Sequence, residues 1–467
     1  MTDGRHPASF RDPSGHVFRR DGILLRQVNR GYASEYDQLM GSGLYERLTH
    51  QRWLIPHEEI ETAGSEDDAA HFKTLRPEPV DFISYPYEWC FSQLRDAALL
   101  TLRIQREALA HDMTLRDASA YNVQFHRGSP VFIDTLSFGH YTDGEPWVGY
   151  RQFCQHFLAP LALMSRRDVR LQQLLISHID GIPLDLAVSL LPRSSWLNLG
   201  LTMHLWMHAR FQRRFEAAGS GASTPPPARK LTRSAQLNML QALEGTVRKL
   251  DWQPEGTEWA DYGNADSYDE AALDFKQGVV QQMLAAIGPK TVWDLGANTG
   301  RYSRIASLAG ARVCSFDVDP ACVELNYRQA RKEQDEMLLP LRLDLVNPSP
   351  GIGWSNRERA TLAERSNADA ILALALIHHL AISNNVPLSD LSQFFARLAP
   401  QLVVEFVPKS DPKVATLLAT RDDIFPDYTR AGFEAAFAND WKLVESTEIE
   451  GSERTLYRCE RLRTPAD

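Results

Sequence analysis

The second half of the chain alternates short apolar runs with segments of helical or loop character. The apolar runs have the length of β-strands and occupy residues 291–295, 312–317, 339–344, 370–376 and 401–407. This alternation is typical of βαβ units, in which helices cover the faces of a parallel sheet. We therefore predict a parallel sheet in this half, preceded by a helix over residues 271–287.

The chain closes on two longer strand-like segments. Residues 441–462 have the pattern of two strands around Glu450-Gly451-Ser452, which has the composition of a turn. We expect a terminal antiparallel hairpin beside the parallel strands. Such a hairpin distinguishes the arrangement from a plain dinucleotide-binding fold.

The first half has a different pattern. Apolar residues at helical spacing predict helices over residues 91–110 and 151–164, with a strand–turn–strand segment between them at 122–134. A stretch rich in small residues, glycine and three consecutive prolines follows at 217–228 and cannot build a packed element. We predict a first domain over residues 1–216, a linker over 217–230 and a second domain over 231–467.

Composition narrows the class of protein. A chain of 467 residues with 43% hydrophobic and 24% charged residues is typical of a globular protein with more than one domain. A formal net charge of −10 gives no general attraction to phosphate backbones, so a nucleic-acid partner is not favoured. The five scattered cysteines, the lack of a signal-peptide pattern and the short longest apolar run at 370–382 favour a cytoplasmic protein without a membrane partner.

The most informative motif follows the first strand of the second half. Asp294 is followed by Gly296, Asn298 and Gly300, and a helix is expected to begin near Thr299. Glycines at such a turn let the backbone approach a ligand closely, and the helix start offers free amide groups. The motif predicts a ligand site at this turn, with Asp294 fixing the position of the residues at one end of the site.

Two further acids follow the next two strands. Asp317 ends the second strand and can accept hydrogen bonds from two ribose hydroxyl groups, and Asp344 ends the third strand, where it could reach an adenine amino group. Open α/β sheets bind ligands at the carboxyl ends of their strands. The three acids therefore mark one edge of the sheet as a nucleotide site.

These residues resemble those of class I S-adenosylmethionine (SAM)-dependent methyltransferases, from about Asp266 to the C-terminus. The resemblance implies a Rossmann-like, seven-stranded α/β sheet with SAM as cofactor and no metal. It implies that the segment 294–300 binds the methionine part, Asp317 the ribose and Asp344 the adenine. Asn298 replaces a glycine that many members carry, and asparagine tolerates the left-handed conformation. A nicotinamide-binding domain and a simple strand–helix cap are the alternatives.

Histidines follow the fourth strand, where the methyltransferase fold faces the sulfonium. His379, and after it His378, could remove a proton from an attacking hydroxyl or amine, although both could instead serve only packing. Glu405 ends the fifth strand and could line the acceptor pocket or pair with Lys409. Ahead of the first strand, Tyr268 and Lys276 could lie over the SAM carboxylate or on a solvated helix face.

The first half contains a second motif. Asp117, Asn122 five residues later, and Asp134 past a short hairpin resemble the catalytic core of protein kinases and aminoglycoside phosphotransferases. That chemistry needs a base for the acceptor hydroxyl and oxygen ligands for magnesium. No glycine-rich phosphate loop precedes the motif, and Lys73 is a poor substitute for the kinase lysine. We predict a kinase-like α+β domain that has lost part of its machinery.

Short sequence segments distributed over the whole chain resemble those of a bacterial group of SAM-dependent methyltransferases similar to the nodulation protein NoeA. They lie at residues 84–90, 117–125, 133–138, 374–380 and 405–409. We therefore predict methyl transfer from SAM to an oxygen or nitrogen of a small-molecule or protein-bound acceptor. A non-catalytic recognition protein and a phosphotransferase with an appended SAM-binding domain are the alternatives.

Overall fold

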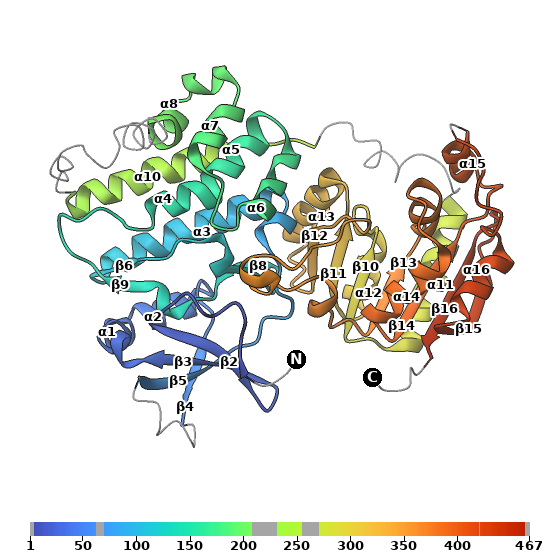
Figure 1. Cartoon of the computed structure of the whole chain (residues 1–467), viewed down its shortest axis with the longest axis horizontal. Helices are drawn as coiled ribbons and strands as arrows, with labels where there is room; N and C mark the ends of the chain where they lie inside the picture. Colours follow the sequence, from blue (N-terminus) through green and yellow to red (C-terminus); the bar gives the residue numbers. More distant parts are fainter. Residues whose placement is uncertain (1–3, 62–69, 208–230, 255–269, 420, 463–467) are drawn as a thin grey trace. The chain divides into compact units, whose positions relative to one another are not determined.

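The chain folds into two compact units. The computed structural model describes residues 4–61, 70–207, 231–254, 270–419 and 421–462. The first unit comprises Met1–Gln253 and Gly351–Arg359, and the second comprises Pro254–Pro350 and Ala360–Asp467 (Figure 1). The predicted linker at 217–230 and Tyr268 lie outside the described residues.

The first unit joins an antiparallel sheet to a set of helices. Its strands are β1 (Gly4–Arg5), β2 (Gly15–Arg20), β3 (Ile23–Asn29), β4 (His57–Ile60), β5 (His71–Pro77), β6 (Met113–Leu115), β7 (Val123–His126), β8 (Ser129–Phe132) and β9 (Phe138–His140). Its helices are α1 (Ala33–Gly41), α2 (Leu44–His50), α3 (Phe91–Ala110), α4 (Tyr150–Phe153), α5 (Ala159–Arg166), α6 (Leu174–Ser177), α7 (Leu184–Leu190), α8 (Leu199–Leu201) and α10 (Arg233–Lys249).

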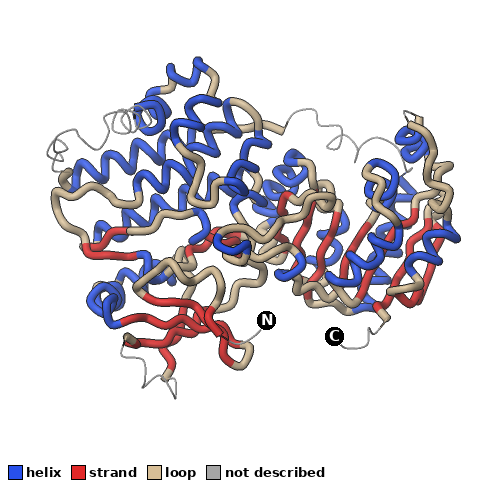
Figure 2. The backbone as a smooth tube through the Cα atoms, in the orientation of Figure 1, coloured by secondary structure: helices blue, strands red, loops and turns tan. Residues whose placement is uncertain are grey.

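The strand order in this sheet is β1-β2-β3-β5-β4, with antiparallel neighbours throughout. Helices α1 and α2 lie in sequence between β3 and β4, and β7 and β8 form the hairpin predicted at 122–134. Figure 2 shows the sheet on one side of the unit and the longer helices on the other. This arrangement agrees with the kinase-like α+β domain predicted for the first half.

Helix α10 belongs to the first unit, although the sequence pattern places residues from 231 onward in the second domain. The helix packs along α3 and buries Leu240, Leu243 and Val247. The chain passes to the second unit only after Gln253, so the composition at 217–228 does not show which unit the following amphipathic helix joins.

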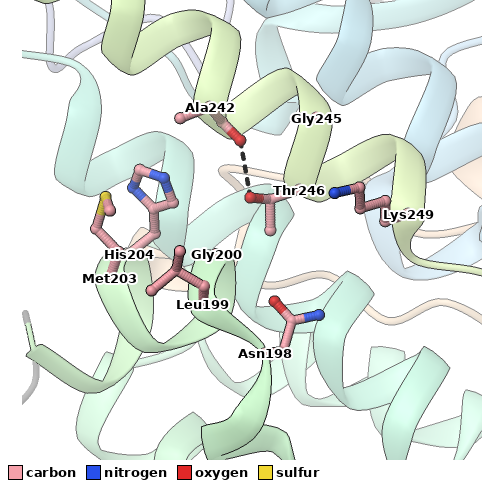
Figure 3. Close-up of a pocket in the computed structure, with 9 residues that line it drawn as sticks. All are labelled: Asn198, Leu199, Gly200, Met203, His204, Ala242, Gly245, Thr246 and Lys249. Carbon is pink, nitrogen blue, oxygen red and sulfur yellow. Dashed lines mark hydrogen bonds between the residues drawn. The ribbon is translucent and has the colours of Figure 1, made fainter.

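Helices α8 and α10 leave a cavity of about 360 Å³ between them (Figure 3). It is lined by Asn198, Leu199, Gly200, Met203, His204, Ala242, Gly245, Thr246 and Lys249. The two glycines differ in their surroundings. A Cβ on Gly200 would lie 2.1 Å from Thr246 Oγ1, whereas a Cβ on Gly245 would meet nothing within 4 Å.

This contrast predicts opposite effects of two matched substitutions. Gly245→Ala should raise the free energy of unfolding by about 1 kcal/mol, because alanine favours the helix interior. Gly200→Ala should lower it by about 1–3 kcal/mol, because Thr246 must move to admit the methyl group. Urea denaturation of the two variants measures both changes, and equal signs would contradict the packing described.

The second unit is a three-layer α/β domain. Its strands are β10 (Thr291–Leu295), β11 (Arg312–Asp317), β12 (Leu338–Arg342), β13 (Ala370–Ala373), β14 (Gln401–Phe406), β15 (Trp441–Glu448) and β16 (Thr455–Arg461). Its helices are α11 (Glu270–Ile287), α12 (Arg301–Leu308), α13 (Pro320–Glu333), α14 (Leu388–Leu398), α15 (Pro412–Leu418) and α16 (Arg430–Phe437).

The sheet has seven strands in the order β12-β11-β10-β13-β14-β16-β15. Strands β10 to β14 are parallel, and β16 runs antiparallel to both β14 and β15. The predicted parallel strands and terminal hairpin are confirmed. The chain proceeds outward from β10 to β12 and then returns to the other side of β10, so a topological switch point lies between β10 and β13.

Alternation along the strands gives each face of this sheet its own core. On one face, Val292, Val313 and Val403 pack with Val280 of α11 and Ala306 of α12. On the other face, aromatic rings pack together: the ring centroid of Phe406 lies 5.4 Å from that of Phe433 of α16, and the Phe433 centroid lies 5.0 Å from that of Tyr457 of β16.

Among the described residues, no helix is long and apolar enough to cross a bilayer.

Candidate active site

A tight turn after β10 forms the centre of the candidate site. Gly296, Asn298 and Gly300 have φ values of 74°, 52° and 80°, all in the left-handed region. Asn298 supports this conformation itself, because its Oδ1 accepts a hydrogen bond from the Thr299 amide at 2.7 Å. Gly300 is the residue that precedes the first turn of α12. The turn therefore carries the backbone into the helix with its amide groups at the sheet edge.

Asp294 anchors the start of this turn. Its side chain is buried, and one oxygen accepts a hydrogen bond from Ser303 Oγ of α12 at 2.6 Å. Burial, together with the nearby charge of Asp317, raises the pKa of Asp294 to about 7. The carboxyl group is therefore poised to change its charge when a cationic group binds beside it.

Asp317, at the end of β11, contacts the turn directly. Its two oxygens accept hydrogen bonds from the Asn298 amide at 2.7 Å and the Asp319 amide at 2.9 Å. Burial raises the pKa of Asp317 to about 6. The structure thus brings Asp294, Asp317 and the glycine turn together at one edge of the sheet.

Asp344 lies two residues past the end of β12 and is exposed. Its side chain accepts a hydrogen bond from the Val346 amide at 2.9 Å. The backbone around it is tied to the site, because the Leu343 amide donates to the Asp317 carbonyl at 2.9 Å. Asp344 is thus on the expected edge but at its rim.

His378 and His379 follow β13 on the other side of the switch point. His378 is 1% exposed, and within the described parts of the chain neither of its ring nitrogens has a hydrogen-bond partner. Its ring lies 4.0 Å from that of His379, centroid to centroid. Burial lowers the pKa of His378 well below its usual range and that of His379 to about 4. Both imidazoles are therefore neutral at physiological pH.

A buried ionic network extends from this edge. Lys276 Nζ of α11 lies 2.6 Å from Glu405 Oε2 of β14, and Arg454 Nη1 lies 3.4 Å from Glu405 Oε1. Arg454 also forms two hydrogen bonds to Asp411, at 2.6 and 3.1 Å. The sequence interpretation offered Lys409 as a partner of Glu405, but Lys409 binds Asp423 at 2.7 Å.

Sequence reasoning missed Arg454 and Asp411 as members of this network. Lys276 and Glu405 are 129 positions apart, and Arg454 and Asp411 are 43 positions apart. Only the three-dimensional fold joins such positions. An arginine beside a turn and an aspartate before a proline carry no local sign of this role.

The kinase-like motif also converges in the first unit. Asp117 accepts hydrogen bonds from the Ser119 amide, at 2.9 Å, and from Asn122. Ser137 Oγ contacts Asn122 Nδ2 at 3.3 Å and donates to Asp134. Burial and the charge of Asp134 raise the pKa of Asp117. The three motif residues therefore form one cluster.

Arg26 of β3 completes the cluster and was missed in the sequence. It forms an ion pair with Asp134 and lies 3.7 Å from Asp12, while only 14% of its side chain is exposed. Lys73, named from the sequence, instead pairs with Glu59 on the surface. The cation beside Asp134 is thus an arginine of β3, the strand that precedes α1.

Comparison with known proteins identifies the family. No protein-family model matches the chain. Over 462 residues the chain is 36% identical to nodulation protein NoeA of Rhizobium meliloti (strain 1021), covering 98% of this chain and 96% of that protein. The chain belongs to the NoeA family.

Solved structures similar to this NoeA-family chain are methyltransferases of low sequence identity. The N-methyltransferase NodS of Bradyrhizobium japonicum WM9 is 12% identical, with 42% of this chain and 99% of NodS covered and a TM-score of 0.31. Magnesium protoporphyrin IX methyltransferase of Synechocystis PCC 6803, with bound S-adenosylhomocysteine, is 17% identical, with 44% and 94% covered and a TM-score of 0.31.

A third similar structure is WbdD bound to a kinase inhibitor. It is 15% identical, with a TM-score of 0.30, and the match spans 43% of this chain and 43% of WbdD.

The strand order and glycine turn of the second unit agree with the resemblance seen in the sequence. The second unit of this NoeA-family protein has the seven-stranded mixed α/β sheet of the methyltransferase fold.

Proposed function

We propose that the chain transfers the methyl group of SAM to an oxygen or nitrogen of a small-molecule or protein-bound acceptor. The observation that supports this most is the contact between Asp317 and the glycine turn at the switch point of the sheet. A ligand hydroxyl could take the place of the Asn298 amide as a hydrogen-bond donor to Asp317. At that position the ligand would also lie close to the backbone of the glycine turn and to the N-terminus of α12.

The residues at this edge fit the parts of SAM. Asp294 would bind the ammonium group, Asp317 the two ribose hydroxyls and Asp344 the adenine amino group. Gly296, Asn298 and Gly300 would admit the methionine portion. A Cβ on Gly300 would lie 2.3 Å from Asn326 Oδ1, so this turn has no room for a larger residue.

Catalysis requires little beyond alignment. When bound, SAM supplies an activated methyl group on a sulfonium. The chain holds the acceptor in line with that group, which lowers the entropic part of the barrier. His378 and His379 are the candidates that receive the acceptor's proton at a ring nitrogen. The sequence favoured His379, but the ring nitrogens of His378, which have no hydrogen-bond partner among the described residues, favour His378 for this role.

SAM affinity should begin to fall as the pH decreases through about 7 and should fall more steeply below about 6. The pKa values of Asp294 and Asp317 are raised to about 7 and about 6, and both groups must be ionised to bind an ammonium and two hydroxyls. Each group that must release a proton on binding weakens affinity about tenfold per pH unit below its pKa. Calorimetry from pH 8 to pH 5 measures this dependence.

In the ligand-free protein, the contribution of Asp294 and Asp317 to folding stability should have the opposite pH dependence. Their folded pKa values exceed the unfolded value of about 4, so their contribution to stability is present at low pH and is lost as the pH rises through 6 to 7. A SAM affinity that stays flat between pH 8 and pH 5 would contradict the assigned roles.

The proposed activity is tested by acceptor-dependent release of S-adenosylhomocysteine. The 467-residue chain, incubated with methyl-tritiated SAM and a small-molecule extract, should give a labelled product, and His378→Ala should reduce the label at least tenfold. A chain that binds SAM but releases no S-adenosylhomocysteine with any extract or protein fraction would favour the non-catalytic alternative.

Phosphotransfer is a second candidate for the first unit, supported by the convergence of Asp117, Asn122 and Asp134. The ion pair of Arg26 with Asp134 occupies the carboxylate that would hold magnesium, and this favours a recognition role over catalysis. Magnesium-dependent ATP binding that is lost in Asp134→Ala would support phosphotransfer. Its absence in the wild-type chain would support the recognition role.

A further inference from the structure

Four charged side chains are buried together in the second unit. The exposed fractions of Lys276, Glu405, Arg454 and Asp411 are 3%, 0%, 3% and 7%. Two cations and two carboxylates compensate one another, so their formal charges cancel. A buried ion pair contributes little net stability, because desolvation offsets its attraction. A functional reason for keeping this cluster must therefore be sought in its position.

The strand register places the cluster over the cofactor side of the sheet. Side chains alternate between faces, so Glu405 shares the face of Val403, which packs against α11. Asp294 shares that face with Val292. Strand β13 separates β10 from β14, and it pairs with both. Lys276 of α11 reaches across this gap.

Lys276 lies beside the methionine end of the glycine turn. Its Nζ is 4.7 Å from the ring centroid of Tyr302, the second residue of α12, and 2.6 Å from Glu405 Oε2. The charge of Asp294 acts on Lys276, and that of Lys276 acts on Asp294. An ammonium group thus stands close to the residue that would bind the amino group of methionine.

The amino-acid portion of SAM carries a carboxylate next to its ammonium group. Asp294 complements the ammonium, but it would repel the carboxylate. Of the two buried cations, Arg454 is held by two hydrogen bonds to Asp411, whereas Lys276 has the compact, rotatable head that can turn between partners.

We propose that Lys276 binds the carboxylate of the cofactor and that Glu405 holds Lys276 in place before the cofactor arrives. This inference rests on the proposed SAM site and adds a residue to it. Without ligand, Glu405 holds the Lys276 ammonium group at the place that the ligand carboxylate would occupy. When the ligand binds, its carboxylate and Glu405 both contact Lys276. Arg454 neutralises Glu405 while Lys276 is shared.

The test removes the carboxylate of the ligand by use of a decarboxylated analogue, and removes the ammonium group of Lys276 by substitution. Calorimetry compares S-adenosylhomocysteine with its decarboxylated analogue, S-adenosyl-3-thiopropylamine, which keeps the amino group. The wild-type chain should prefer S-adenosylhomocysteine about 10- to 100-fold, as expected for a charged hydrogen bond. Lys276→Met should abolish this preference, and Lys276→Arg should retain part of it.

A matched double variant guards against misfolding. Lys276→Met alone leaves Glu405 short of a cation, whereas Lys276→Met with Glu405→Gln removes both partners of the pair. The double variant should fold, bind the decarboxylated analogue within about threefold of wild type, and show no preference for the carboxylate. Glu405→Gln alone should reduce the preference without abolishing it, because a neutral amide holds the Lys276 ammonium group less firmly.

The outcomes separate this inference from the proposed function. If the double variant still prefers S-adenosylhomocysteine tenfold, Lys276 does not bind the carboxylate and the inference is wrong, while the SAM site stands. If the wild-type chain binds neither ligand, the proposed function fails, and the inference fails with it.

Discussion

Replacing Asp317 with alanine is expected to weaken SAM binding about 100-fold or more. The ribose hydroxyls lose a charged acceptor, and each hydrogen bond to a charged group contributes about 1.5–3 kcal/mol. The same substitution removes the group that accepts hydrogen bonds from the Asn298 and Asp319 amides, so the ligand-free turn is also less ordered. Isothermal calorimetry with SAM measures the loss.

Asp344→Ala provides the control for this experiment. Asp344 is exposed at the rim of the site, and its loss removes at most one contact to the adenine. We expect a change of about tenfold or less. Equal effects of the two substitutions, or unchanged affinity in Asp317→Ala, would show that the ribose does not bind at the end of β11.

Gly300→Ala is expected to destabilise the second unit and to abolish SAM binding. The residue has φ 80°, where a non-glycine residue costs about 1–2 kcal/mol. Its new Cβ would also lie 2.3 Å from Oδ1 of Asn326, a buried side chain fixed by a 2.8 Å hydrogen bond to Ser315. Strain and overpacking together should cost about 2–5 kcal/mol.

Gly310→Ala isolates the backbone part of this cost. Gly310 has φ 90°, but a Cβ there would meet nothing within 4 Å. It should lower the free energy of unfolding by about 1–2 kcal/mol and leave SAM affinity unchanged. Urea denaturation of both variants gives the comparison. A Gly300→Ala variant no less stable than Gly310→Ala would rule out the clash with Asn326.

The sequence predicted the second unit well because its signals are local. Short apolar runs fix the strands, and a turn between two such runs fixes the hairpin. The strand predicted at 370–376 ends earlier, at Ala373, because Ala375 adopts a left-handed conformation with φ 49°. No residue type in that stretch signals the break, since alanine, leucine and isoleucine all suit a strand.

The candidate site was predictable only in part, for the same reason. Asp294, Asp317 and the glycines follow strand ends, so their positions could be inferred from the order of elements. The sequence named Lys276 as a candidate for the SAM carboxylate but could not distinguish this from a solvated position, because its burial depends on the pairing with Glu405, far along the chain. In the first unit, Arg26 was hidden because arginine is common on exposed strands and its partner Asp134 lies in another element.

The final hairpin supplies a cation to the interior of the second unit. Strand β14 is bounded by β13 on one side and by β16 on the other, and Arg454 stands immediately before β16. Arg454 lies between two carboxylates, those of Glu405 and Asp411, which come from a strand and from the start of a helix. A chain that ends before Arg454 would keep both buried acids and lose the cation that bridges them.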